Sequence, residues 1–370
     1  MLSANDDLLG HQTSATFDRA GGGDPRWTER YWYTAHPIDG RPIIIDVGLG
    51  YYPNRGVMDA FAGVTIANRQ HNFRASRRLG DRPLDTTVGP LSIRIVEGQR
   101  RHRLALVENE SGIRFDVQFD SRFPSTEEVH SYRERDGKVE EDLARVAQFG
   151  RWSGSLVVDG ESFSIEPETW WGQRDRSWGL RSIFSSDPAR PPVQRHKNLF
   201  WTWSMFQFED FAFTLFVKER SNTPFYLSGA EVRRHADGTC STREVVSVDH
   251  EIEWLDDPLG QTIGKARFTL GFAEGPARVV EVEGLEARYY LKSGMYGGLG
   301  GWQQGDDRGD YHSAADIWNL LDPADRELAR TLSDHAMRAT CEGAVGWGIS
   351  EYGVAPGYPR YETPQRFPAF

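Results

Sequence analysis

The stretch IRFDVQFDS, residues 113–121, alternates apolar and polar side chains. Successive side chains of a β-strand point to opposite faces of its sheet, so this strand would have one buried and one solvated face. That pattern is typical of an antiparallel sheet that is packed on one side. The stretch therefore predicts an antiparallel β-protein, with the core side chains Ile113, Phe115, Val117 and Phe119.

Segments of the same kind recur on both sides of this stretch. ERYWYTAH at 29–36 and PIIIDVGLGYY at 42–52 precede it, and NLFWTWSMFQF at 198–208 follows it. Runs of β-branched and aromatic residues between Gly, Asp, Asn and Pro are typical of strands. One helix is predicted near 323–332, where Asp322 can cap the amino end. The chain is therefore expected to be all-β with few short helices.

The stretch SSDPARPPVQRHKN at 185–198 interrupts the strand pattern. It holds three prolines and several charges without apolar periodicity, which is typical of a domain boundary. At 370 residues the chain is also longer than most single domains. We expect a flexible leader over 1–27, a first β-domain over 28–190 and a second over 191–370. Each domain would be a curved antiparallel sheet, a barrel or a sandwich.

Composition and charge argue against several classes of protein. The 43 basic and 54 acidic residues give a net charge of -11, whereas nucleic-acid binders concentrate positive charge. The two cysteines, Cys240 and Cys341, fit no disulfide framework or zinc spacing. The amino end lacks the basic start and apolar core of a signal peptide, and no run of about 20 apolar residues could span a membrane. We expect a soluble cytoplasmic protein.

Spacings that would bind a cofactor or a metal ion also fail. GGLGGWQQG at 297–305 begins like a dinucleotide loop, but Gln303 occupies the third glycine position of G-x-G-x-x-G. GRWSGS around Ser153 lacks the G-x-S-x-G spacing of a nucleophile elbow. The ten histidines show neither H-x-H nor H-E-x-x-H spacing. No metal, nucleotide or other cofactor is therefore expected.

WWGQRDRSWGLR, residues 170–181, places three charges between tryptophans. In an extended strand Arg174 and Arg176 share one face and Asp175 lies on the other. Burying such charges without partners is costly, so they must pair, reach water or surround a polar group of a ligand. Two interpretations follow: a fixed ion-pair network at the domain junction, or the wall of a ligand site.

The chain resembles the hydroxyneurosporene synthase/AttH-like family, whose members include carotenoid 1,2-hydratases. The most specific match is the pattern G-x-R-D-x-S-W-G-x-R, which begins at Gly172 and ends at Arg181. QFGRWSGSLVVDG before it, FWTWSMFQFED after it and GWGISEYGV around Glu351 extend the likeness loosely over 28–357. The resemblance implies two lipocalin-like β-domains, a ligand cavity near their junction, and hydration or cyclisation of hydrophobic molecules.

A hydrophobic ligand agrees with the strand at 200–208, which is apolar on both faces and must lie in a core or line an apolar cavity. Without a cofactor, proton transfer by carboxyl groups is the simplest chemistry. Asp175 is expected to be an ionised base or orienting group, and the acid to be Glu209, Asp210 or Glu351. The residues expected to contact the substrate are Trp171, Gln173, Arg174, Arg176, Trp178, Trp201, Trp203, Met205, Tyr296 and His312.

These observations predict a cofactor-independent lyase, hydratase or isomerase. Its substrate would be a terpenoid, steroid or aromatic-like molecule in a cavity near the domain junction. A non-catalytic carrier and a carbohydrate-binding protein are the alternatives, because aromatic side chains also line carrier cavities and stack on sugars. Convergent polar groups in the cavity wall would favour catalysis. The expected partner is a hydrophobic small molecule, with no nucleic acid and no membrane span, and a homodimer is compatible with these patterns.

Overall fold

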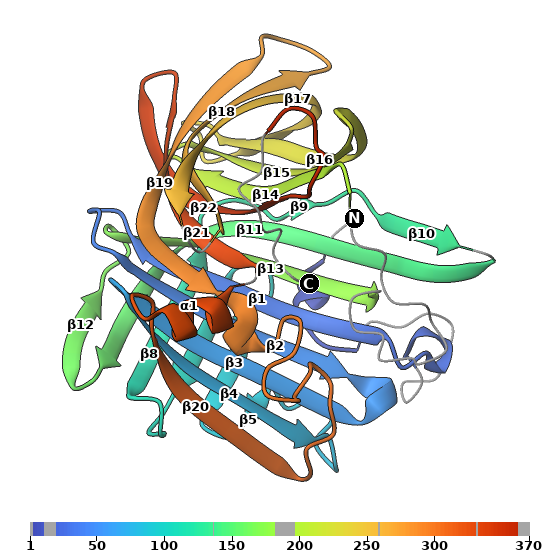
Figure 1. The fold of residues 1–370 in the computed structure, drawn as a ribbon, viewed down its shortest axis with the longest axis vertical. Helices are drawn as coiled ribbons and strands as arrows, with labels where there is room; N and C mark the ends of the chain where they lie inside the picture. The colour runs from blue at the N-terminus through green and yellow to red at the C-terminus, as the bar shows by residue number, and fades with distance from the viewer. Residues whose placement is uncertain are drawn as a thin grey trace.

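The computed structural model describes residues 3–10, 20–135, 137–181, 197–257, 260–330 and 332–361. Its antiparallel strands form two units, a curled open sheet and a closed barrel, which lie one above the other in Figure 1. This confirms the all-β class expected from the alternating pattern. The boundary expected at 185–198 lies mostly outside the described residues, so the division into domains stays a prediction.

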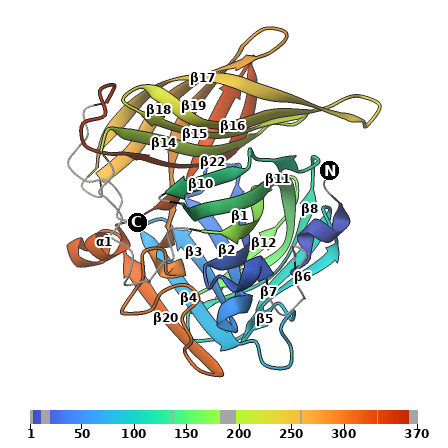
Figure 2. The same cartoon turned by 90° about the vertical axis from the view of Figure 1, so that its right-hand side faces the viewer.

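The first unit is a sheet of 14 strands. They are β1 (Trp27–Pro37), β2 (Ile43–Tyr52), β3 (Val57–Ile66), β4 (Arg69–Arg78), β5 (Thr87–Val88), β6 (Leu91–Glu97), β7 (Arg101–Leu106), β8 (Ile113–Ser121), β9 (Thr126–Glu127), β10 (Ser131–Arg135), β11 (Lys138–Val158), β12 (Glu161–Ile165), β13 (Trp170–Leu180) and β20 (Tyr311–Asn319). The main path runs β20-β4-β3-β2-β1-β13-β11-β8-β7-β6-β5. Figure 2 shows how it curls, so that β5 and β6 approach β3 and β4.

The alternating stretch at 113–121 lies in β8, as predicted. Its four apolar side chains are buried in the core inside the curled sheet, and the residues between them are exposed or half-buried. Burial of each apolar side chain contributes about 1.5–3 kcal/mol, which is why a period of two residues specifies the face that turns inward. The pattern therefore predicted both the strand and the face of the strand that is buried.

One strand of this sheet comes from the second half of the chain. β20 pairs with β4, where His312 is opposite Ser76 and Asn319 is opposite Arg69, and Figure 1 shows it at the edge of the sheet. The chain therefore returns to the first unit after building most of the barrel. A division at residue 190 does not by itself separate the two units.

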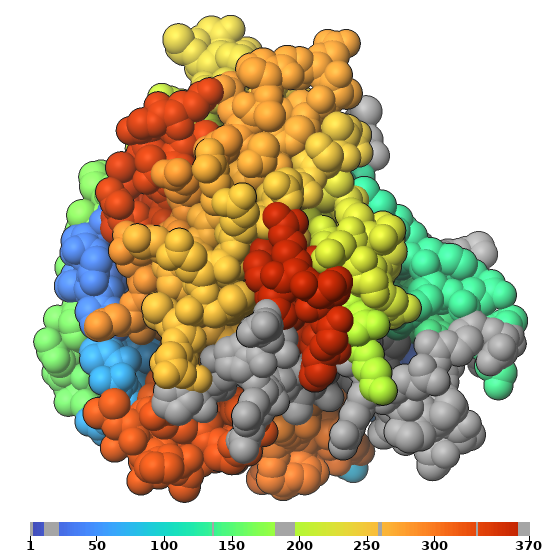
Figure 3. Space-filling view, turned by 45° about the horizontal axis from the view of Figure 1, so that its top comes forward, coloured from blue at the N-terminus to red at the C-terminus, as the bar shows by residue number. Residues whose placement is uncertain are grey.

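The second unit is a barrel of eight strands, closed by pairing of the last strand with the first. In order around the barrel they are β14 (Leu199–Gln207), β15 (Phe211–Arg220), β16 (Thr223–Arg234), β17 (Cys240–Asp257), β18 (Gly260–Phe272), β19 (Arg278–Tyr290), β21 (Ser333–Cys341) and β22 (Ala344–Val354). Tyr358 donates a hydrogen bond to Glu219, and Tyr361 donates one to the carbonyl of His250. The last described residues, red in Figure 3, thus lie against the barrel strands.

Helices are few in the described part of the chain. The α-helix α1 (Pro323–Ala329) begins where predicted, because the Asp322 carboxylate accepts hydrogen bonds from the amides of Ala324 and Asp325. It ends at Ala329, so the expected extension to Leu332 is wrong. Short 3-10 turns occur at η1 (Ala4–Asp7), η2 (Ala20–Gly23), η3 (Pro53–Arg55) and η5 (Leu291–Gly294). Within the described ranges, no helix is long and apolar enough to cross a membrane.

The described part of the leader is packed against the first sheet. Asp7 is fully buried and pairs with Arg174, with its Oδ1 2.6 Å from Nη1, and its Oδ2 lies 2.9 Å from Nε2 of His102. Burial opposes the charge of Asp7, but the hydrogen bond to His102 and the charge of Arg174 hold the pKa of this carboxyl below its usual range. Residues 3–10 therefore differ from the flexible leader expected over 1–27.

A separate apolar layer joins the sheet to the barrel. On β14, Trp201, Trp203 and Met205 belong to this layer, whereas Phe200 and Phe206 belong to the core of the barrel. Both faces of the strand are therefore buried, which explains why its sequence is apolar throughout. For Trp201 and Met205 the structure selects packing between two cores, one of the two alternatives that the sequence allowed.

Stability is expected to fall in mild acid because His36 in β1 is buried. Burial lowers the pKa of its imidazole from 6.5 to about 4, so the unfolded chain binds this proton first. The stability that comes from keeping this imidazole neutral is fully present above about pH 6.5. It is lost as the pH falls, and the loss reaches about 3 kcal/mol near pH 4. We expect His36→Asn to flatten the dependence of the unfolding free energy on pH in this window. An unchanged slope in urea titrations would contradict this assignment.

Candidate active site

Three carboxyl groups meet where the sheet faces the barrel. Asp46 comes from β2, Asp334 from β21 and Glu351 from β22. Asp334 lies between the other two, within hydrogen-bonding reach of each if a proton is shared. The indole Nε1 of Trp32 is 3.1 Å from Oδ1 of Asp46 and 3.1 Å from Oδ2 of Asp334. We call Asp46, Asp334 and Glu351 the carboxyl cluster.

The carboxyl cluster holds protons. Burial raises the pKa of Asp46, Asp334 and Glu351 well above the ordinary carboxyl range, and repulsion among the three groups adds to this. The second oxygens of Asp46 and Asp334 are buried without an N–H or O–H donor, so a hydrogen bond between two carboxyl groups requires a proton on one of them. Asp46 and Asp334 are fully buried, whereas Glu351 is only partly buried. Glu351 is therefore the member that a ligand can reach.

An ion-paired group continues from the cluster along the sheet. Asp175 of β13 is the direct cross-strand neighbour of Trp32 and pairs with Arg145 of β11, at 3.2 Å between Oδ2 and Nε. Arg145 Nη1 lies 3.2 Å from Oε2 of Glu128, whose other oxygen accepts a hydrogen bond of 2.6 Å from the indole of Trp203. The side chains of Asp175 and Arg145 are 14% and 13% exposed, so both are partly accessible to solvent.

Tyr296 and Arg30 lie near the same carboxyl groups. The Arg30 guanidinium stacks on the ring of Tyr296 at 4.9 Å, and this ring meets Phe61 edge-on at 6.4 Å. Burial raises the pKa of the Tyr296 phenol, while the charge of Arg30 opposes this. Glu351 and Asp175 are also among the charges that act on the phenol. A buried carboxyl group, a paired carboxylate and a phenol thus lie near one another.

Arg174 and Arg176 do not belong to this site, although the sequence suggested that they contact the substrate. Both side chains are fully buried on the face of β13 that turns away from the barrel. Arg174 pairs with Asp7, and Arg176 pairs with Glu29 inside the first sheet. Strand geometry separates them from Asp175, because neighbouring residues point to opposite faces. The charged stretch is thus a buried ion-pair network on one face, and on the other it places Asp175 near the carboxyl cluster.

Glu209 also lies apart from the carboxyl cluster. It is exposed in the turn between β14 and β15, with its oxygens 2.6 Å from Arg122 and 2.9 Å from Arg151. The hydrogen bond from Arg122, helped by Arg151 and opposed by burial, lowers the pKa of Glu209. An ionised surface carboxylate is poorly suited to donate a proton. Asp210 is exposed as well and pairs with Arg234 at 3.5 Å.

The other residues expected to contact substrate are dispersed. Trp171 is buried beneath the guanidinium of Arg151, 3.7 Å from its ring. Trp178 is half-buried beside Arg176, and His312 stacks on Trp302 at 4.9 Å at the edge of the sheet. Trp201 and Met205 pack in the layer between the units. Of the expected contacts, the structure brings Trp203 and Tyr296 to the site of Asp175 and Glu351. Gln173 is fully buried on the same face of β13 as Asp175.

Sequence reasoning missed Asp46, Asp334 and Trp32. A signal existed for Asp46, which is a single carboxyl group in the apolar run PIIIDVGLGYY. A charged residue at a position where strand patterning demands burial has to be neutral, paired or functional. Asp334 carried no such signal, because SDHAMRATC reads as an ordinary polar strand start. Its role depends on the pairing of β21 in the barrel.

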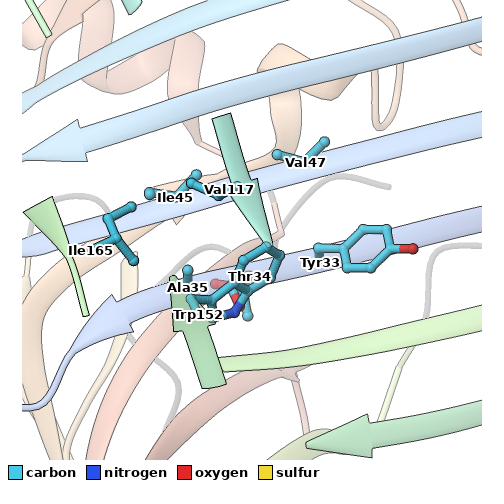
Figure 4. Close-up of a pocket in the computed structure, with 8 residues that line it drawn as sticks. All are labelled: Tyr33, Thr34, Ala35, Ile45, Val47, Val117, Trp152 and Ile165. Carbon is cyan, nitrogen blue, oxygen red and sulfur yellow. The ribbon is translucent and has the colours of Figure 1, made fainter. Parts of the chain in front are cut away.

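A small cavity lies elsewhere, inside the first sheet. Figure 4 shows its lining of Tyr33, Thr34, Ala35, Ile45, Val47, Val117, Trp152 and Ile165. Its volume of about 10 Å³ is close to that of one water molecule. It is almost wholly apolar and is too small for a substrate. In the described residues, no group of three His, Cys, Asp or Glu side chains has the geometry to hold a metal ion.

Removing one carboxyl group from the cluster should stabilise the fold at neutral and alkaline pH. The raised pKa of Asp334 means that the folded state binds this proton more tightly than the unfolded state, so stability is lost as the pH rises above about 4. In Asp334→Asn the amide can still accept a hydrogen bond from Trp32 but does not ionise on unfolding. We expect the variant to gain stability relative to the native chain between pH 5 and 9 in urea denaturation. A constant loss at every pH would contradict this.

Two solved structures resemble this chain at low identity. A protein provisionally assigned as AttH from Nitrosomonas europaea has a TM-score of 0.56 and 13% identity, covering 95% of this chain and 98% of that one. Kievitone hydratase from Nectria haematococca has a TM-score of 0.40 and 12% identity, covering 87% of this chain and 88% of that one. The first similarity concerns the fold alone and agrees with the AttH-like architecture expected from the sequence. The second similarity is too low to indicate a shared fold.

No curated protein matches the sequence at a significant level. One family model, described as a family of unknown function (DUF8625), matches residues 2–358. This match includes all three members of the carboxyl cluster and both structural units. Because it extends over nearly the whole chain, this protein belongs to the family of unknown function DUF8625.

Proposed function

We propose that this chain is an acid–base enzyme, a hydratase, lyase or isomerase, that acts on a hydrophobic small molecule bound in a recess between sheet and barrel. The observation that carries the proposal is the carboxyl cluster, which keeps a proton in a buried setting and is open to a ligand only at Glu351. Buried carboxyl groups with raised pKa values are typical of general acids, and such groups gather at active sites more often than elsewhere.

In the proposed reaction Glu351 donates its proton to a carbon–carbon double bond or to a leaving hydroxyl group. The π bond or the C–O bond breaks, a C–H or O–H bond forms, and a cationic carbon remains. The faces of Trp203 and Tyr296, next to the carboxylates, are suited to stabilise that cation. Loss of a proton then gives an alkene, and addition of water gives an alcohol.

Asp175 is proposed as the base or as an orienting group. Its ion pair with Arg145 keeps it in place beside Trp32, and a paired carboxylate is suited to accept a proton from the substrate or from water. Carboxyl groups in two different settings, one protonated and one paired with a cation, are the arrangement expected for an acid and a base. A carrier would need only the apolar part of this recess.

The proposal is tested with the molecule that copurifies with the protein, identified by mass spectrometry. Because the proton of Glu351 equilibrates with solvent, incubation in D₂O should place one non-exchangeable deuterium on carbon if Glu351 protonates a double bond. If it protonates a hydroxyl group, the deuteron should leave in water and the molecule should be converted to an alkene. The Glu351→Gln variant should bind the same molecule without labelling it. Recovery of unlabelled and unconverted ligand from the native protein would support a carrier in place of an enzyme.

A further inference from the structure

The side chain of Tyr296 is held from two sides. The Arg30 guanidinium lies 4.9 Å from the centre of its ring, and Phe61 meets the ring edge-on, with the two ring planes at 90°. Tyr296 follows Met295, which has a φ of 64°, in the left-handed region that residues other than glycine seldom adopt. Such a conformation persists only where the surrounding structure enforces it. The ring is thus fixed in orientation, although the residue is only half-buried.

Arg30 is itself held by a residue that is far away in the sequence. It is 3% exposed on β1, and its Nη1 donates a hydrogen bond to Oε1 of Gln304. Gln304 is 2% exposed, and its amide nitrogen donates a hydrogen bond of 2.7 Å to the carbonyl of Gly294. Glutamine is seldom buried to this extent, and buried amides need partners for both ends. Gln304 thus ties Arg30 to the turn that carries Tyr296.

Arg30 also faces the candidate active site. It precedes Trp32 by two residues on β1, so the two side chains share a face and lie roughly 7 Å apart along the strand. Trp32 bonds to two members of the carboxyl cluster, and its direct cross-strand neighbour is Asp175. The phenol of Tyr296 and the carboxylate of Asp175 are both among the groups whose charges act on Arg30. Arg30 and Tyr296 therefore lie next to the proposed acid and base.

We propose that the Tyr296 hydroxyl binds the oxygen atom that the proposed reaction adds or removes, and that Arg30 is the positioning residue that aims this hydroxyl. The inference rests on the proposed function and narrows it to hydration and dehydration. Arg30 does not touch the substrate in this proposal. It acts through the orientation and the acidity of the phenol.

The step is written most simply for dehydration. Glu351 gives its proton to the hydroxyl group of the substrate, the C–O bond breaks, and its electron pair leaves with the water molecule. Asp175 then takes a proton from the neighbouring carbon, so that the double bond forms. Tyr296 keeps its own proton and donates a hydrogen bond to the departing oxygen. Exchange with solvent restores the protons of both carboxyl groups, and hydration is the reverse.

A phenol beside a guanidinium is suited to this role. Burial raises the pKa of Tyr296, so the hydroxyl keeps its proton at neutral pH, and the charge of Arg30 opposes part of that rise. A nearby cation polarises the O–H bond and makes it a stronger hydrogen-bond donor. The phenol is therefore neutral but better at donating than an isolated tyrosine.

The assignment is tested by a double-mutant cycle on kcat for the copurified compound. Tyr296→Phe removes the hydroxyl and keeps the ring, so Arg30 can still stack on it. We expect this variant to lower kcat about 10-fold, as for one lost hydrogen bond. Arg30→Met should lower kcat in the native background and have no further effect in the Tyr296→Phe background. The loss of stability from Arg30→Met should be the same in both backgrounds, because the stack is lost in both.

Arg288 and Tyr290 provide the matched control, because the Arg288 guanidinium also stacks on a tyrosine ring, at 5.1 Å. They lie on the face of the barrel wall opposite to Asp334, as their pairing with β21 shows. Arg288→Met should have the same effect on kcat whether or not Tyr290 carries its hydroxyl. Additive losses of kcat for Arg30→Met and Tyr296→Phe would overturn the positioning role, and a fully active Tyr296→Phe would overturn the role of the hydroxyl.

A second pair of variants keeps the test decisive if Arg30→Met does not fold. Gln304→Ala leaves the guanidinium in place and removes its support, and Gln303→Ala makes the same change at the exposed neighbouring residue. We expect kcat to fall in Gln304→Ala, again only when Tyr296 carries its hydroxyl, and to stay native in Gln303→Ala. Equal kcat in these two variants would contradict the inference. Failure of the proposed function would instead appear as a native protein that neither labels nor converts the compound.

Discussion

Glu351→Gln is expected to lower turnover by about 100- to 10,000-fold, the range found for the loss of a proton-transfer group. The amide has nearly the shape of the carboxylic acid and can still bond to Asp334, but it has no acidic proton to donate. The fold should survive, because the substitution removes a buried group whose ionisation is already unfavourable. The measurement is kcat and KM for the copurified compound, together with circular dichroism and thermal unfolding.

Glu209→Gln is the matched control for this experiment. It makes the same chemical change at an exposed carboxylate that pairs with Arg122 and Arg151 at the edge of the contact between the units. Exposed ion pairs contribute little to stability, so turnover and stability should both stay close to native values. If the two variants lost activity equally, or if Glu351→Gln remained fully active, Glu351 would not be the acid.

Arg174→Met is expected to cause the largest loss of stability, about 3–5 kcal/mol, as for other broken buried ion pairs. Its guanidinium binds Asp7 through Nη1 and Nη2, and Nε donates to Gln148 at 2.7 Å. Methionine fills part of the space but leaves Asp7 charged in a fully buried position. The melting temperature should fall by roughly 10 °C, and residues 3–10 should become accessible to proteases.

Two further variants separate a lost charge partner from lost packing. Adding Asp7→Asn to Arg174→Met should restore part of the stability, because it removes the buried charge that has lost its guanidinium partner. Arg103→Met, which breaks an exposed ion pair with Asp116 on the same sheet, should have little effect. A double variant that is less stable than the sum of the two single losses would contradict the ion-pair explanation.

Substitutions on the two faces of β13 should affect stability and turnover differently. Arg174 and Arg176 support the fold from the inner face, so their loss should lower stability and activity together. Asp175 lies on the outer face near the carboxyl cluster, so its substitution should alter turnover more than stability. The composition of residues 170–181 could not separate these roles, but an extended strand separates them by pointing neighbours to opposite sides.

Much of the fold could be predicted because strand patterning is local. The alternation at 113–121, the cap at Asp322 and the apolar run at 199–207 each depend on neighbours only a few residues away, and each agrees with the structure. Hydrophobic burial with a period of two residues sets which face of a strand is buried, whatever the rest of the chain does. The division of the chain was harder, because β20 pairs back into the first sheet.

The candidate site was decided by tertiary structure. The sequence alone determined that the chain is an antiparallel β-protein. It also singled out Asp175 and Glu351, because aromatic residues surround these two carboxyl groups in the sequence. Only the packing of sheet against barrel brings Asp46 of β2 to Asp334 of β21 and Glu351 of β22. The protonation of these groups follows from their shared burial and mutual repulsion, and both depend on distances through space between strands remote in the chain, which no local pattern encodes.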